Sequence, residues 1–301
     1  MKLHTVNGLI DVMGINSTMI HEHLVFDLTH VRNDADSKLH SSDVTEEIEG
    51  LQASGCDLIV EVSNIGMGRN PLGMLEISER TGISIIASTG FYKECFYPSF
   101  VFESSAESLS EIFIRELEVG MDETSIKAGL IAEIGSSLNE ITVAEEAVFH
   151  AAIIAHQATG APISTHCEIG TMGRQQLALF EKYGADLSKV SFGHQDLNLD
   201  TNEQRELLRS GAFIQFDTIG KNNYRTDEDR ALNLVQLLED GFEDRLMLSC
   251  DITRKSHLRQ HGGHGYNHLY ESFIPKLKQH GVTDTVLEKM LKVNPRNFLN
   301  F

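Results

Sequence analysis

The chain has 301 residues, 41% of them hydrophobic, and a formal net charge of −19 at pH 7. This size and composition fit a globular protein, and we expect one domain over residues 1–301. The acidic charge argues against nucleic acid and anionic membranes as partners, because both select basic surfaces. Apolar runs shorter than the roughly 18 residues of a membrane span, a polar N-terminus and cysteines without CxxC spacing predict a cytoplasmic protein with reduced thiols.

Short apolar runs alternate with longer amphipathic segments along the whole chain. The predicted strands are Thr18–Val25, Asp57–Ser63, Ile83–Thr89, Gly129–Gly135, Pro162–His166, Val190–His194, Ala212–Asp217 and Leu246–Asp251. The predicted helices are Ser42–Ser54, Leu72–Thr81, Leu109–Gly120, Thr142–Gly160, Met172–Tyr183, Thr201–Ser210 and Asp227–Gly241. Eight strands with crossover helices in about 300 residues predict an α/β protein with a (β/α)8 TIM barrel. Before Thr18, a turn at Asn7-Gly8 predicts a short N-terminal β-hairpin that caps the barrel.

The first predicted strand contains two histidines, in the sequence MIHEHLVF. His21 and His23 point to the same side of an extended strand, whereas Glu22 points elsewhere. Active sites of this barrel lie at the C-terminal ends of the strands. The other polar residues at predicted strand ends are Glu133, His166, His194, Asp217 and Asp251.

These seven side chains favour a metal site. A lone histidine at a strand end is more often a structural, hydrogen-bonded residue, but the convergence of four histidines and three acids on one barrel end is an improbable result of packing. Imidazole and carboxylate groups are suitable ligands for zinc and similar divalent ions. Two such ions account for six of the seven residues.

The motifs HEHL, AEIG, STH, GHQD, QFDTIG and SCDIT, in this order over nearly the whole chain, resemble those of the phosphotriesterase family of the amidohydrolase superfamily, particularly its phosphotriesterase homology protein branch. The resemblance implies two divalent metal ions, Zn²⁺ or alternatively Mn²⁺, and a homodimer. It implies that His21, His23 and Asp251 hold the more buried ion, that His166 and His194 hold the more exposed one, and that Glu133 bridges them.

Two positions depart from the family members that cleave organophosphate triesters. Those members bridge their ions with a carbamylated lysine, where this chain has Glu133. They also carry a histidine directly after the aspartate of the seventh strand, where this chain has Thr218. We therefore expect no carbon dioxide dependence and no efficient triesterase activity.

Two divalent ions lower the pKa of a bound water to about 7, so a metal-bridging hydroxide is the expected nucleophile. Asp251 is the expected catalytic proton acceptor. Basic residues follow several strand ends, and although each alone reads as a solvated charge, together they predict a small anionic substrate. The expected substrate-binding residues are Tyr92, Lys93, Lys221, Arg225 and Arg254.

Three hypotheses remain open. The first is a metal-dependent hydrolase that cleaves an anionic phosphorus ester, either a phosphonate monoester or a phosphodiester. The second is a lactonase that acts on a phosphorylated sugar lactone, and the third is a barrel that binds metal and ligand without turnover. The first is favoured because the substrate charge can lie on the reacting group, close to the ions. The histidines that fall on no strand end are expected not to be ligands: they are His257, His261, His264 and His268.

Overall fold

The computed structural model describes residues 2–300, and its strands form two parallel ladders. One ladder runs in the order β13 (Leu246–Leu248), β12 (Phe213–Phe216), β11 (Val190–Phe192), β10 (Ile163–Cys167), β9 (Leu130–Ser136) and β8 (Ser88–Thr89). The other runs β3 (Thr18–Glu22), β6 (Leu58–Glu61) and β7 (Ser84–Ile86). Only Ala87 separates β7 from β8, so the two ladders meet in one strand.

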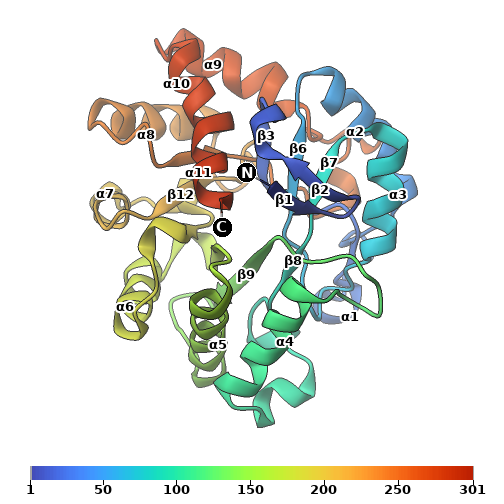
Figure 1. The fold of residues 1–301 in the computed structure, drawn as a ribbon. Coiled ribbons are helices and arrows are strands. Elements are labelled where there is room, and N and C mark those ends of the chain that lie inside the picture. The colour runs from blue at the N-terminus through green and yellow to red at the C-terminus, as the bar shows by residue number, and fades with distance from the viewer. Residues whose placement is uncertain (1, 301) are drawn as a thin grey trace.

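The ladders close into a barrel between β13 and β3, where the His21 amide donates to Ser249 Oγ at 3.0 Å. Counting β7 and β8 together, the barrel has eight strands, each at the position of a predicted one. Helices surround this barrel (Figure 1). The predicted (β/α)8 TIM barrel is confirmed.

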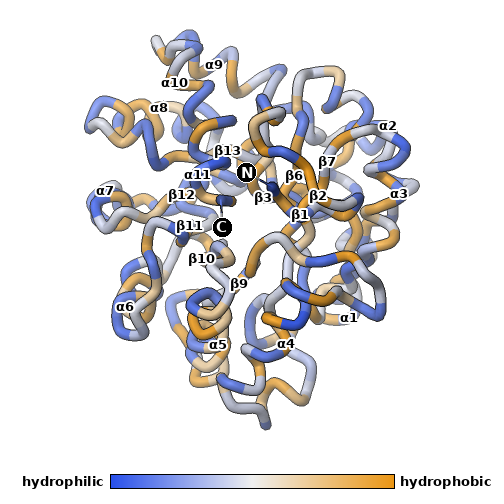
Figure 2. Tube along the Cα trace, in the orientation of Figure 1, coloured by the Kyte–Doolittle hydropathy of each residue, from blue (hydrophilic) through white to orange (hydrophobic). Residues whose placement is uncertain are grey.

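The outer helices are those that the amphipathic segments predict, with ends that differ by a few residues. They are α2 (Ser41–Ala53), α3 (Pro71–Thr81), α4 (Ala106–Glu118), α5 (Val143–Thr159), α6 (Gly173–Tyr183), α7 (Thr201–Arg209) and α8 (Asp227–Glu239). Local sequence explains their ends: α5 begins with a reciprocal capping box between Thr142 and Glu145 and ends at Gly160, whose φ is +78°. Figure 2 shows hydrophobic and hydrophilic residues alternating along these helices, as their packing on the sheet requires.

Several short elements were not predicted. They are α1 (Thr29–Arg32), α9 (Ile274–Gln279), α10 (Asp284–Glu288), α11 (Asn294–Leu299), the π-helical turns Leu269–Phe273 and Lys289–Val293, and the strand pair β4 (Phe26–Asp27) and β5 (Lys38–Leu39). Short 3₁₀ turns lie at Val12–Gly14, Glu94–Phe96, Ser99–Glu103, Glu168–Gly170, Leu187–Lys189, Gln195–Leu197, Lys255–His257 and Arg259–His261. None of the described helices is long and apolar enough to cross a membrane.

The predicted N-terminal hairpin is present as β1 (Lys2–Thr5) and β2 (Gly8–Asp11), an antiparallel pair in which Thr5 faces Gly8. Leu3 of the hairpin and Phe298 of α11 belong to one buried apolar cluster with Ile20 of the barrel strand β3. The N-terminal hairpin and α11 therefore lie near the barrel axis (Figure 1) and cover its N-terminal end. The C-terminal ends of the strands are left to carry the polar residues.

Candidate metal centre

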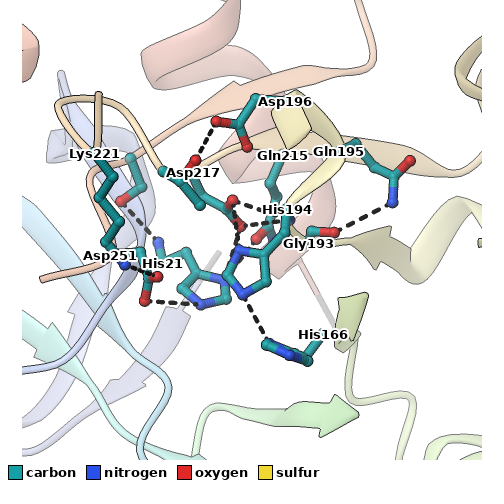
Figure 3. A network of polar contacts seen from close by, with 12 residues as sticks. His21, His166, Gly193, His194, Gln195, Asp196, Gln215, Asp217, Lys221 and Asp251 are labelled. Carbon is teal, nitrogen blue, oxygen red and sulfur yellow. Dashed lines mark hydrogen bonds and ion pairs between the residues drawn. The ribbon is translucent and has the colours of Figure 1, made fainter. Parts of the chain in front are cut away.

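The six predicted ligands come together at the C-terminal end of the barrel. His166 Nδ1 lies 2.7 Å from Glu133 Oε1, and His194 Nε2 lies 2.7 Å from His166 Nδ1. His21 Nε2 is 3.4 Å from Glu133 Oε1, and Asp251 joins the group from the end of β13 (Figure 3). Each of the six is at most 5% exposed: His21, His23, Glu133, His166, His194 and Asp251.

Hydrogen bonds on the far side of each imidazole leave the inner nitrogen as an acceptor. Gln215 Oε1 lies 2.8 Å from His21 Nδ1, so Nε2 of His21 faces the other five residues with a lone pair. Ser63 Oγ has the same relation to His23 Nδ1, also at 2.8 Å. Such outer contacts are typical of metal-binding histidines, because they fix both the tautomer and the ring orientation.

Several inner atoms of this cluster lack hydrogen-bond partners among residues 2–300. His21 Nε2, Glu133 Oε2 and Asp251 Oδ1 are buried without a hydrogen bond. Carboxylates hold the outer nitrogens of His166 and His194, so the inner nitrogens of these two rings place lone pairs 2.7 Å apart. Buried acceptors that face one another are destabilising unless a cation lies between them. This donor set therefore fits divalent metal ions.

Glu133 has the position of a bridging ligand. It can share one ion with His21 and His23 and a second ion with His166 and His194, because the ligand atoms of each group lie within 4.8 Å of one another. Its two carboxylate oxygens allow both contacts at once.

Asp217 is the seventh polar residue at a predicted strand end. It contacts two of the candidate ligands on the side that faces away from the cluster. Its Oδ1 accepts hydrogen bonds from the backbone N–H of His194 and from Nδ1 of the same residue, both at 2.9 Å. Its Oδ2 lies 3.2 Å from His21 Nδ1. One buried carboxylate thus orients two ligand rings, and in the described structure it stands behind them rather than beside the other ligands (Figure 3).

Glu22, the last residue of β3, lies between His21 and His23 and has a structural role that the sequence did not reveal. It points away from the cluster, as the alternation of a strand predicts. Its carboxylate accepts hydrogen bonds from Ser249 Oγ (2.7 Å) and from the backbone N–H groups of Cys250 (2.6 Å), Asp251 (3.2 Å) and Ile252 (3.1 Å). It therefore fixes the segment that carries Asp251.

Glu168 was also missed, although it follows His166 by two residues in the sequence THCEIG. Its Oε2 accepts from His166 Nε2 at 2.6 Å and from Lys93 Nζ at 2.5 Å. Burial alone would raise the pKa of the Glu168 carboxyl, but His166 and Lys93 hold this pKa well below its usual value. The signal in the sequence was an acid close behind a ligand histidine, which commonly marks an outer partner of that ligand.

A cavity of about 480 Å³ opens at the cluster. Four of the five predicted substrate-binding residues line it: Tyr92, Lys93, Lys221 and Arg254. Arg225 lies outside this cavity, because its guanidinium donates to the Asp196 carbonyl (2.7 Å) and to Asn233 Oδ1 (3.0 Å). Arg225 follows β12, as the sequence indicates, but its hydrogen bonds to Asp196 and Asn233 keep its side chain out of the cavity lining.

The four histidines of the loop after β13 remain outside the ligand groups and outside the cavity lining. The His264 ring packs between those of His257 and His268, with centroids 5.3 and 5.6 Å away. His268 Nε2 lies 2.6 Å from Asp227 Oδ2.

A model of the phosphotriesterase family matches residues 1–299. The chain belongs to this family. It is 44% identical to the phosphotriesterase homology protein of Escherichia coli over 93% of this chain and 97% of that protein. The crystal structure of the Escherichia coli protein, complexed with phosphate in its active site, superposes with a TM-score of 0.94 at 43% identity, covering 97% of this chain and 100% of that one.

Other relatives are an N-acetyltaurine hydrolase and a lactonase. Human N-acetyltaurine hydrolase is 30% identical and covers 100% of this chain and 98% of its own length. A lactonase from Listeria monocytogenes superposes with a TM-score of 0.95 at 27% identity, covering 100% of this chain and 99% of that one. Family membership and the ligand cluster together make the chain a metal-dependent hydrolase that acts on ester bonds.

Proposed function

We propose that this hydrolase cleaves an anionic phosphorus ester, a phosphonate monoester or a phosphodiester. The observation that carries the proposal is the ion pair between Lys221 and Asp251 at the cavity wall (Figure 3). Lys221 is only 6% exposed, so a fixed ammonium lies directly beside the metal ligands. A cation in this place favours a substrate whose reacting group is itself charged. The phosphate in the active site of the Escherichia coli relative supports the same chemistry.

Two divalent ions, which we propose are Zn²⁺ with Mn²⁺ as the alternative, supply Lewis acidity and lower the pKa of bound water when present. The residues proposed to hold them are His21, His23, Glu133, His166, His194 and Asp251. The protein's own contribution is orientation: Gln215 and Asp217 fix the tautomer of His21, and Glu168 fixes that of His166.

Asp251 is the proposed proton acceptor. Burial raises the pKa of its carboxyl, but the Lys221 ammonium and the neighbouring histidines hold this pKa well below its ordinary value. The group therefore stays ionised at neutral pH and can accept a proton. Lys221 engages Oδ2, while Oδ1 remains without a hydrogen bond and faces His23 Nε2 at 3.3 Å.

A second candidate is hydrolysis of a phosphorylated sugar lactone. The lactonase relative matches this chain over its full length, and the same donor set can act on a carbonyl carbon. Binding without turnover is the third possibility, and the complete ligand set with an ionised Asp251 argues against it.

The test compares two substrates on protein loaded with zinc or manganese: an aryl methylphosphonate monoester and a phosphorylated pentono-lactone. We expect kcat/KM to be higher for the phosphonate. A preference for the lactone would replace the phosphorus proposal with the lactonase. No turnover of either substrate by metal-loaded protein would favour the binding barrel. The Asp251→Asn variant, purified identically, controls for contaminating hydrolases.

A further inference from the structure

Most cationic side chains of the cavity already form an ion pair with an acid of the protein. Four cationic and four acidic side chains line the cavity, in a chain whose net charge is −19. Three of the four cations form ion pairs, which are Lys93 with Glu168, Lys221 with Asp251, and Arg254 with Asp34. The fourth is Arg32, for which the described structure shows no ion pair and no side-chain hydrogen bond.

Arg32 ends the short helix α1, in the loop region that follows β3. Its Nη1 is buried and lacks a hydrogen-bond partner. The guanidinium carbon lies 5.9 Å from the centre of the Phe96 ring, and Lys93 Nζ lies 6.0 Å from the same centre. The Arg32 guanidinium therefore lies over the face of the Phe96 ring. Its N–H groups remain available to another partner.

An unpaired guanidinium N–H inside a cavity is costly unless a ligand supplies an acceptor. The flat fork of N–H donors matches an oxyanion with two accessible oxygens, such as a carboxylate, a sulfonate or a phosphate. Lys93 is less suited to this role, because Glu168 already occupies its ammonium. Arg32 is therefore the cavity cation that is free to bind a ligand charge.

We propose that Arg32 binds a second anionic group of the substrate, on the part of the molecule that does not react. Arg32 contacts Phe96, the Phe96 ring packs on Tyr92 at 4.9 Å, and Tyr92 packs on His166 at 4.7 Å. Two aromatic rings thus stand in the row of contacts from Arg32 to the cluster, which favours a ligand charge away from the reacting atoms. The substrate class is then an ester that carries a carboxylate, sulfonate or phosphate substituent away from the scissile bond. This inference rests on the proposed function for the type of reaction. It goes further by proposing that the substrate carries a second anionic group, which Arg32 binds.

The test uses two pairs of matched probes. The first pair is 4-carboxyphenyl and 4-carbamoylphenyl methylphosphonate, which differ in charge and little in shape. The second pair is 4-carboxybenzyl- and 4-carbamoylbenzylphosphonate, whose carbon–phosphorus bond is not an ester. The first pair reports kcat/KM, and the second reports Kd by calorimetry on metal-loaded protein, so binding is measured without turnover.

We expect the wild-type protein to prefer the carboxylate of each pair by about tenfold or more, the size of a charge-assisted hydrogen bond. Arg32→Gln should abolish this preference, and Arg32→Lys should keep part of it. Lys182→Gln on α6 is the matched control, because it removes a paired cation outside the cavity and should leave the preference in place. The preference is a ratio, so a partly unfolded variant does not distort it.

The two proposals fail in different ways. Carboxylate selectivity in binding that depends on Arg32, without hydrolysis of either ester, supports the Arg32 site and counts against the phosphorus ester. Hydrolysis of both esters with equal kcat/KM, together with equal Kd values for the second pair, overturns the Arg32 site and leaves the reaction intact. A carboxylate preference that Arg32→Gln does not change also overturns it.

Discussion

Glu22 accepts the backbone N–H of Asp251 across the seam where the barrel closes, from β3 to the end of β13. Asp217 accepts the backbone N–H of His194 in the same way. Both acceptors hold residues with left-handed backbone, φ +52° at Asp251 and φ +55° at His194, which is unfavourable for residues with a side chain. Two carboxylates outside the cluster therefore stabilise the conformation that aims two ligands inward.

Glu22→Gln should weaken this arrangement. An amide keeps one acceptor oxygen but turns an NH₂ group toward the Ser249 hydroxyl and the N–H groups of residues 250–252. We expect a loss of about 1–3 kcal/mol in the free energy of unfolding, together with lower metal content. Urea unfolding and elemental analysis measure the two quantities. Exposed Glu46→Gln on α2 is the control, and equal behaviour of both variants would contradict the role given to Glu22.

Mutations of the two acids in the cluster should have different effects on metal content and on turnover. Asp251→Asn retains an oxygen ligand but loses the proton acceptor, so the metal content should be kept while kcat falls about 100-fold or more. Glu133→Ala removes the bridge and should lose metal. Metal analysis and kcat of both purified variants check this, and full activity of either variant would refute the mechanism.

The sequence was sufficient to predict the barrel and to predict that the six candidate ligands meet at one end of it. Strand ends of a parallel barrel meet at one end, so position along the chain was enough to bring His21 and Asp251 together. Side chains whose partners come from other loops were beyond this reasoning. Arg225 looks like a free cation in the sequence, but it is satisfied by Asp196 and Asn233.

Arg32 shows the converse case. In the sequence it is one of several charged residues after the first strand, near Asp34 and Asp36, and nothing marks it as unpaired. Its lack of a partner depends on the loop after β8, which brings Phe96 against it, and on Arg254, which takes Asp34. Pairing between loops is decided by three-dimensional packing, which hydrophobic periodicity does not encode.

Glu168→Gln tests the outer contact of His166. An amide can still accept from His166 Nε2 but loses the charge that favours this tautomer, so metal affinity should fall by about 10- to 100-fold. Competition with a fluorescent zinc chelator measures this affinity. Glu181→Gln, in an exposed position on α6, provides the control. Unchanged affinity in Glu168→Gln would show that the contact does not orient the ligand.

Metal removal should destabilise the whole barrel. Without ions, the buried lone pairs of His21, Glu133 and Asp251 face one another unpaired. A ligand at 100 times its Kd stabilises the folded state by about 2.7 kcal/mol, so we expect Tm to fall by several degrees on chelation and to recover with zinc or manganese. Calorimetric scans with and without chelator measure this. An unchanged Tm would mean that the cluster does not bind ions in the folded protein.

The histidines after β13 should make the fold sensitive to acid. Burial lowers the pKa of His264 to about 3, with His257 and His268 adding to the effect, and burial lowers that of His257 to about 4. Because these values lie below the ordinary pKa of about 6.5, the unfolded chain binds more protons, and stability is lost as the pH falls from about 6.5 toward 4. His264→Gln should therefore lose less unfolding free energy than wild type between pH 7 and pH 5. Urea unfolding with chelator in every sample excludes metal release as the cause, and exposed His261→Gln should behave like wild type. Equal acid sensitivity of His264→Gln and wild type would show that His264 is protonated in the folded protein.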